Sequence, residues 1–215
     1  MTDYREGAAS PITSGGPSLR LQREAERLRT AVREAIRTSP GSFLKTVEDV
    51  EAKADDYWLH EIRSSTWVVA ERDGVFVGVA AAKLPDPDKD REDRADSRYI
   101  ESVWIAPDLR RNRLGERLIT YLMAAELGKN PNIKQFLLWV FETNSSAIRL
   151  YEHMNFVCTP EREEGPDSRT EIKYRLDVNH QTWAAIGETV AEAALSATKQ
   201  KHGVTYRLLG EGDSA

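Results

Sequence analysis

The chain has 215 residues, of which 40% are hydrophobic and 30% are charged, a composition typical of a globular protein with one full core. The formal net charge of −5 disfavours general nucleic-acid binding, and no apolar run approaches the roughly 18 residues that span a bilayer. The single cysteine, Cys158, has no second cysteine for an internal disulfide, which fits a reducing compartment. We therefore expect a cytoplasmic protein with no nucleic-acid or membrane partner.

The first part of the chain predicts two helices and a hairpin. A flexible arm rich in glycine and serine (1–17) precedes apolar residues at helical spacing from residue 19 to about 36. A second helix is predicted over 47–62, with these residues facing inward: Val47, Val50, Ala54, Tyr57, Trp58 and Ile62. Two β-rich runs then flank Asp73-Gly74, a dipeptide typical of two-residue hairpin turns.

The middle of the chain predicts a strand–helix–strand unit. It follows an acidic, aperiodic segment (85–97) that is expected to be a mobile loop. Residues 98–106 predict a strand, and the nearly continuous apolar run 133–142 predicts a second strand buried on both faces. The helix between them has an inner face of Leu114, Leu118, Tyr121, Leu122 and Ala125. Such a unit indicates a parallel pair of strands inside a mixed sheet.

The last part of the chain predicts a short helix capped by Asn144, and then two strands within 156–159 and 170–178, separated by an acidic loop. Cys158, on the first of these strands, is expected to be a small core residue. An alanine-rich helix over 182–199 and a strand over 203–210 complete the predicted elements.

The segment PDLRRNRLGERL, from Pro107 to Leu118, places arginines at the start of a helix, where partial positive charge disfavours cations. The same turn presents backbone N–H groups that no earlier residue of the helix can satisfy, and Gly115 allows close approach of a ligand or a strand. The arginines become favourable if a phosphate or pyrophosphate fills the turn. The alternative is a solvated surface on which Asp108 and Glu116 keep the arginines apart.

Two segments resemble a known family. Residues 98–126 are similar to the cofactor-binding strand–loop–helix of the GNAT-superfamily N-acetyltransferases, whose Arg/Gln-x-x-Gly-x-Gly/Ala loop corresponds to residues 110–115. Residues 141–156, FETNSSAIRLYEHMNF, resemble the second motif of that family. Arg113 stands where the family usually has its first glycine, and Asn155 replaces the glycine before Phe156.

The resemblance implies a three-layer α+β fold. A mixed, mostly antiparallel central sheet would carry helices on both faces and a V-shaped splay between two parallel strands, 98–106 and 133–142. The acetyltransferase domain would cover 18–178. Residues 179–215 lie outside the resemblance and are expected to form a helix–strand extension packed on the same domain; the alanines along 184–197 indicate close helix packing, which would cover the sheet or build a homodimer.

The resemblance also implies acetyl-CoA as co-substrate, bound in the splay. Its pyrophosphate would lie on the backbone amides of the turn, formed by Arg110, Arg111, Asn112, Arg113, Leu114 and Gly115. The pantetheine arm would pair with the backbone of Val103 and Ile105, and Asn144 would hold the arm from the other side. No metal site is expected, because the histidines lack ligand spacing.

Direct attack by an amine on the thioester requires that the ammonium first lose a proton. Glu101 is the candidate general base, because it is a carboxylate inside an apolar strand and by alternation shares a face with Tyr99 and Val103; it could equally be a solvated glutamate. Glu142 is the second candidate. Tyr151 has the position of the family's tyrosine acid, which would protonate the leaving thiolate, and the alternative for it is a core tyrosine.

The sequence thus predicts an acetyl-CoA-dependent N-acetyltransferase that moves an acetyl group to a primary amine of a small molecule or peptide in a ternary complex. The acidic segments 86–96 and 161–167 favour a cationic acceptor. A non-catalytic acyl-CoA-binding sensor would keep the arginine turn but need neither Glu101 nor Tyr151. A purely structural or interaction protein would need no anion at the helix start.

Overall fold

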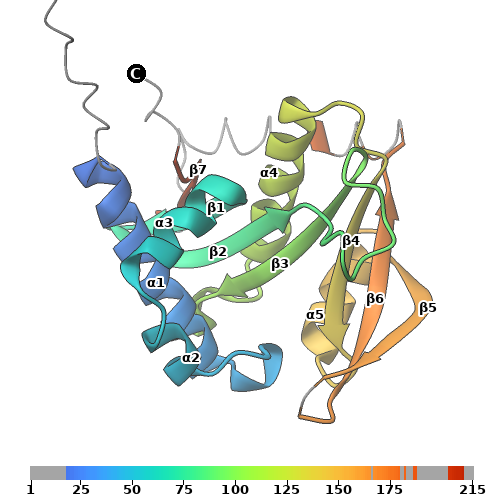
Figure 1. The fold of residues 1–215 in the computed structure, drawn as a ribbon, viewed down its shortest axis with the longest axis horizontal. Helices are drawn as coiled ribbons and strands as arrows, with labels where there is room; N and C mark the ends of the chain where they lie inside the picture. Colours follow the sequence, from blue (N-terminus) through green and yellow to red (C-terminus); the bar gives the residue numbers. More distant parts are fainter. Residues whose placement is uncertain (1–17, 166, 180–181, 183–185, 188–202, 211–215) are drawn as a thin grey trace, which may run out of the picture.

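The computed structural model describes residues 18–165, 167–179, 182, 186–187 and 203–210 (Figure 1). Its helices are α1 (Leu19–Thr38), α2 (Val47–Glu51), α3 (Asp55–Ser64), α4 (Leu114–Lys129) and α5 (Ser145–His153), with short 3-10 turns η1 (Pro40–Ser42) and η2 (Pro107–Leu109). Its strands are β1 (Thr66–Arg72), β2 (Val75–Lys83), β3 (Ser97–Ile105), β4 (Gln135–Phe141), β5 (Val157–Glu164), β6 (Thr170–Asp177) and β7 (Thr205–Leu208). The expected arm at 1–17 and nearly all of the expected helix at 182–199 lie outside the described residues.

The described strands form one mixed sheet between two layers of helices (Figure 1). The strand order is β5-β6-β4-β3-β2-β1-β7, and in this sheet β3 and β4 form the one parallel pair. One hydrophobic core lies between the sheet and α1–α3, and the other lies between the sheet and α4 and α5. This arrangement confirms the predicted three-layer α+β fold.

The parallel strands β3 and β4 separate after a short stretch of pairing. Ser97–Tyr99 pair with Gln135–Leu137, and no further pairs join the two strands. Beyond this point β3 stays paired with β2, and β4 stays paired with β6. Because each strand keeps its outer partner, the sheet opens between them, and the predicted V-shaped splay is confirmed.

A β-bulge in β3 changes which residues share a face. Ser102 has a φ of +56°, and the pairing with β2 skips from Ala81↔Glu101 to Val79↔Trp104. An extra residue in one strand of a pair reverses the side-chain alternation beyond it. Glu101 therefore faces the α1–α3 layer with its partner Ala81, whereas Val103 packs against the core of α4 and α5. The prediction that Glu101 and Val103 share a face is wrong for this reason.

The predicted helix over 47–62 is wrong in its continuity, because it is divided into α2 and α3. Thr46 and Asp49 form a capping box at the start of α2. Ala54 has an extended backbone and is the N-cap of α3, so it is exposed rather than inward-facing. The acidic pair Asp55-Asp56 in the first turn of α3 favours a new helix start there.

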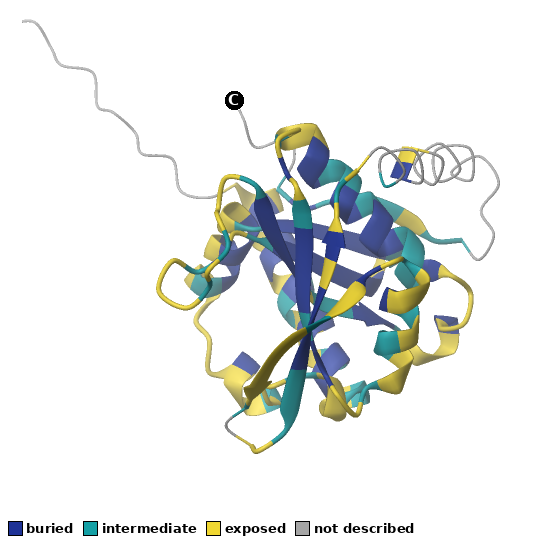
Figure 2. Cartoon of the chain, turned by 90° about the vertical axis from the view of Figure 1, so that its right-hand side faces the viewer, coloured by how far each residue is buried: buried dark blue, intermediate teal, exposed yellow. Residues whose placement is uncertain are grey.

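The edge strand β5 corrects two further expectations. It runs to Glu164, so the acidic residues expected in a loop lie partly on a strand whose backbone pairs with β6. Figure 2 shows β5 exposed along nearly its whole length. Cys158 is exposed and is not a core residue, because an edge strand with one neighbour and no helix over it leaves its side chains in solvent.

The remaining connections follow the predicted turn chemistry. Asp73 and Gly74 have φ values of +50° and +78°, as the two central residues of a type I′ hairpin turn require. The acidic segment between β2 and β3 is tied down at Glu92, which accepts a hydrogen bond from the Tyr99 hydroxyl at 2.9 Å and pairs with Lys173. This segment therefore forms one wall of the splay.

Candidate active site

The splay opens into a cleft of about 2340 Å³. Pockets for a single small ligand usually measure about 300–1,000 Å³, so this cleft has room for more than one such molecule. Its walls are the arginine turn, the separated ends of β3 and β4, the α1–α2 loop, the acidic segment before β3, and the β5–β6 hairpin. The cleft thus joins every segment from which the sequence predicted functional residues.

The turn before α4 presents backbone N–H groups outward. Arg111 and Arg113 have φ values of +63° and +59°, and Arg113 is the N-cap of α4. The cap has no side-chain hydrogen bond, and the first intrahelical bond is donated by the Arg117 N–H to the Arg113 carbonyl. The N–H groups of Leu114, Gly115 and Glu116 therefore have no acceptor within the helix. Such a helix start binds anions readily.

Two of the arginines are held by protein groups. Arg110 donates from Nε to the Ile105 carbonyl at 2.9 Å and from Nη2 to the Ser39 hydroxyl at 2.7 Å. Arg113 pairs with both carboxylate oxygens of Glu116, at 2.9 and 2.8 Å, and this hydrogen bonding lowers the pKa of Glu116. The guanidinium of Arg113 is thus directed to Glu116 rather than into the turn, so the residue that departs from the family pattern leaves the turn accessible.

The other residues of the turn set its backbone. Asn112 donates its amide hydrogens to the carbonyls of Leu109 and Arg110, both at 3.3 Å. Leu114 is buried in the core, so only its backbone can contact a ligand. A Cβ on Gly115 would lie 3.2 Å from Cδ2 of Leu150 on α5. The glycine therefore also allows the helix start to pack closely against α5.

The backbone of β3 faces the splay at Val103 and Ile105. The Ala106 N–H donates to the Val77 carbonyl on β2 at 2.8 Å. Because successive residues of a strand direct their backbone groups to opposite sides, those of Val103 and Ile105 are directed away from β2. They lie where β4 no longer pairs with β3, so an extended ligand could add to this edge.

Asn144 lines the cleft from the end of β4. Its Oδ1 accepts a hydrogen bond from the Ala147 N–H at 3.2 Å and caps α5, and its Nδ2 donates to the Ser42 hydroxyl at 3.2 Å. The side chain therefore joins α5 to the η1 turn across the cleft.

The candidate bases differ in position. Glu101 lines the cleft with a side chain that is 48% exposed, and its carboxylate lies 3.4 Å from Nζ of Lys83. Glu142 is exposed and is not among the residues that line the cleft. The structure thus brings Glu101, and not Glu142, to the opening between the two strands.

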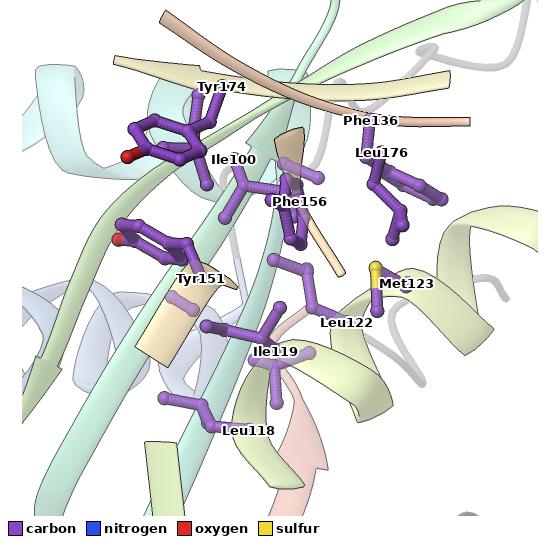
Figure 3. Close-up of a cluster of buried hydrophobic side chains, with 14 of the residues drawn as sticks. Ile100, Leu118, Ile119, Leu122, Met123, Phe136, Tyr151, Phe156, Tyr174 and Leu176 are labelled. Carbon is purple, nitrogen blue, oxygen red and sulfur yellow. The ribbon is translucent and has the colours of Figure 1, made fainter. Parts of the chain in front are cut away.

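Tyr151 lies against the core and also lines the cleft. Its residue is 7% exposed, and its ring centroid is 5.9 Å from that of Phe156. Within the described part of the chain its hydroxyl has no hydrogen-bond partner, whereas the neighbouring Tyr174 donates to Glu152 at 3.1 Å. Figure 3 shows the Tyr151 hydroxyl directed away from Leu122 and Met123. Burial raises the pKa of Tyr151, so the phenol stays protonated at neutral pH.

Prediction from the sequence missed the polar side chains on the face of the sheet opposite α4 and α5. Lys83 lies 3.1 Å from Glu61 as well as near Glu101; burial lowers its pKa, but the two carboxylates outweigh burial and raise it. Lys173 is buried beside Glu92, with its Nζ 5.4 Å from the ring centroids of both Tyr99 and Trp139.

Glu171, on the same strand as Lys173, is half-buried in the cleft. The alternation of charged and apolar residues in TEIKYRLDV was the available signal for both residues.

Comparison with known proteins agrees with this geometry. Residues 30–156 match the family model described as the acetyltransferase (GNAT) family. A mycothiol acetyltransferase from Thermobispora bispora is 29% identical over 111 residues, which are 52% of this chain and 35% of that protein.

Solved structures resemble the fold at low sequence identity. A ribosomal-protein-alanine N-acetyltransferase from Brucella melitensis has a TM-score of 0.59 at 18% identity, covering 73% of this chain and 96% of that chain. Arabidopsis thaliana NAA60 in complex with acetyl-CoA has a TM-score of 0.53 at 18% identity, covering 73% and 94%.

The protein belongs to the GNAT acetyltransferase family, because the family model covers more than half of the chain. The alignment spans about a third of the mycothiol acetyltransferase, at 35% of its length. In the described part of the chain, no helix is both long and apolar enough to cross a membrane.

Proposed function

We propose that the protein is an acetyl-CoA-dependent N-acetyltransferase that moves an acetyl group to a primary amine of a small molecule or peptide. The observation that carries the proposal is the splay, because it connects two faces of the sheet that carry different groups. The arginine turn and α5 lie on one face, and Glu101, Lys173 and Glu171 lie on the other. A donor and an acceptor can therefore approach the same opening from opposite sides.

The donor side fits acetyl-CoA. The unsatisfied N–H groups at the start of α4 would hold the pyrophosphate, with Arg110 and Arg111 supplying positive charge around it. The backbone edge at Val103 and Ile105 would pair with the amides of the pantetheine arm. Asn144 would bound the arm on the β4 side. Two of the similar solved structures are described as complexes with acetyl-CoA, which supports this assignment.

The acceptor side fits a cationic amine. Many carboxylates line this side of the cleft, interspersed with lysines and arginines; the carboxylates include Glu61, Asp86, Asp90, Glu92, Glu101, Glu161, Glu163 and Glu171. Those without a counterion among the described residues, Glu163 and Glu171 included, would attract an ammonium group. Similar structures include a ribosomal-protein-alanine N-acetyltransferase and NAA60 with a bisubstrate analogue, so peptide amines belong in the first set of acceptors to be tested.

The reaction would proceed by direct attack. The ammonium gives one proton to a base, for which Glu101 is the sequence-predicted candidate, and the amine nitrogen then bonds to the thioester carbonyl carbon. The C–S bond breaks, the nitrogen loses its second proton, and the departing sulfur gains one. Because the pKa of Tyr151 is raised, full proton transfer to a thiolate is unfavourable. Its hydroxyl would instead donate a hydrogen bond to the charge that develops on sulfur.

Two measurements test the proposal. Calorimetry with acetyl-CoA should show binding, and absence of binding at millimolar concentration would overturn both the enzyme and the alternative, a non-catalytic acyl-CoA sensor. A thiol-release assay with spermidine, kanamycin, free lysine and short peptides separates these two. Binding without thiol release from any amine would favour the sensor.

A further inference from the structure

Glu171 occupies a central position on the acceptor side of the cleft. It lies on β6 between two cross-strand partners, Phe141 on β4 and Glu163 on β5. Its neighbours Ile172 and Tyr174 pack into the core of α4 and α5, so alternation directs Glu171 to the opposite face. This is the face of Glu101, and both carboxylates line the cleft.

The surroundings of Glu171 are unfavourable for a carboxylate. Burial raises the pKa of Glu171, and the negative charges of Glu163, Asp167 and Glu101 raise it further. Arg169 opposes them. However, Arg169 already pairs with Asp167, donates to the carbonyls of Gly41 and Phe43, and stacks 3.8 Å from the ring centroid of Phe141.

Three carboxylates on the same wall of the cleft have counterions. Glu101 and Glu61 share Lys83, and Glu92 has Lys173. Among the described residues, no ion pair or hydrogen bond engages the side chain of Glu171. A half-buried carboxylate without a partner is destabilising unless a ligand supplies one.

A second, independent observation points to a ligand at the same opening. Tyr151 is 7% exposed and lines the cleft from α5, on the other face of the sheet. Its hydroxyl has no hydrogen-bond partner within the described part of the chain. Because Tyr151 lines the cleft and its hydroxyl is not among the enclosed polar atoms of the described residues, polar atoms of a bound substrate can reach this hydroxyl. The unpaired groups on the two faces thus flank the splay.

We propose that Glu171 is the general base of the reaction and that the acceptor ammonium takes the place of its missing counterion. This inference rests on the proposed acetyl transfer. The Glu171 carboxylate accepts one proton from the ammonium, which leaves a neutral amine and a neutral carboxyl group. The amine then forms the C–N bond as the C–S bond breaks. When the amide forms, the nitrogen releases its second proton, and the departing thiolate takes up one proton, so that no net proton is gained or lost in this step. Glu163 favours the transfer because it disfavours a second negative charge beside it.

The test compares Glu171→Gln with Glu164→Gln, a matched control on the same hairpin that is exposed and does not line the cleft. The assay is thiol release from acetyl-CoA with the amines named above, measured from pH 5 to 9. Glu171→Gln should lower kcat/KM by about a hundredfold or more and abolish the acid limb of the pH profile. Glu163→Gln should shift that limb to lower pH, because it removes a charge that raises the pKa of Glu171. Acetyl-CoA affinity should be unchanged in all three variants.

An activity-independent measurement uses the same variants. A carboxyl group whose pKa is raised by folding loses stabilisation as the pH rises through its folded pKa. Wild type and Glu171→Gln should therefore melt alike at pH 4, and the variant should have the higher Tm at pH 8. Glu164→Gln should show no such pH-dependent difference.

The outcomes distinguish failure of the Glu171 assignment from failure of the acetyltransferase proposal. If wild type turns over an amine and Glu171→Gln matches Glu164→Gln in rate and pH profile, Glu171 is not the base and the acetyltransferase proposal stands. A raised KM with the acid limb retained would also exclude it as the base. If wild type releases thiol with no amine of the panel, the catalytic proposal fails and the assignment of Glu171 fails with it.

Discussion

Substitution of Tyr151 by phenylalanine removes one oxygen atom from the base of the cleft. The hydroxyl makes no hydrogen bond within the described residues, so the variant loses no bond in the folded protein. The ring, with a residue exposure of 7% and a centroid 5.9 Å from that of Phe156, stays in place. Because the hydroxyl has no partner among the described residues and lines the open cleft, the free energy of unfolding should be nearly unchanged.

The effect on turnover should be much larger than the effect on stability. A hydrogen bond to a charged group contributes about 1.5–3 kcal/mol, which corresponds to about 10- to 150-fold in rate. We therefore expect kcat to fall by that factor in a thiol-release assay, with acetyl-CoA affinity by calorimetry nearly unchanged. Parallel losses of turnover, affinity and stability would refute this reasoning and assign Tyr151 a packing role.

Substitutions at three further positions test the cofactor side and the acidic wall. Asn144→Asp should keep the cap on the Ala147 N–H and lose only the hydrogen bonds that the side-chain amide donates. Asn144→Ala should lose the cap as well, which lowers the free energy of unfolding by about 1 kcal/mol. Thermal melts combined with acetyl-CoA titrations distinguish the two variants. Arg111→Ala should weaken acetyl-CoA binding about tenfold at low salt without changing Tm, and a salt-independent affinity would contradict the anion site. At Glu92, burial raises the pKa, but hydrogen bonds from Lys173 and Tyr99 outweigh burial and lower it. Stability from this group should therefore be lost as the pH falls below about 4.3, and Glu92→Gln should flatten that part of the urea-unfolding profile.

The sequence was sufficient wherever the determining interactions are local. Asp73-Gly74 predicted its turn because few residues other than glycine, asparagine and aspartate adopt positive φ at both central positions. The continuous apolar run of β4 predicted a strand buried on both faces, which the sheet confirms. The arginine turn was identifiable because a helix start imposes its own electrostatics on the residues around it.

Two local signals indicate that the predicted helix over 47–62 is divided. Thr46 and Asp49 form a capping box, and Asp55-Asp56 marks a second helix start, so the division of the predicted helix over 47–62 was readable. At Cys158 no local signal existed. A strand pattern does not show whether the strand lies at the edge of a sheet, and this position decides whether its side chains are covered.

Tertiary structure alone decided the chemistry of the acceptor side. The bulge at Ser102 places Glu101 and Val103 on opposite faces, and it becomes visible only when β3 is paired with β2. Glu171 meets Phe141 and Glu163 because three strands from distant parts of the chain are in register. The sequence by itself determined most of the elements, the hairpin turn and the position of the arginine turn at a helix start, since backbone preferences act over a few residues. The opposing carboxylates were determined by strand pairing, because electrostatic neighbours depend on distance in space rather than along the chain.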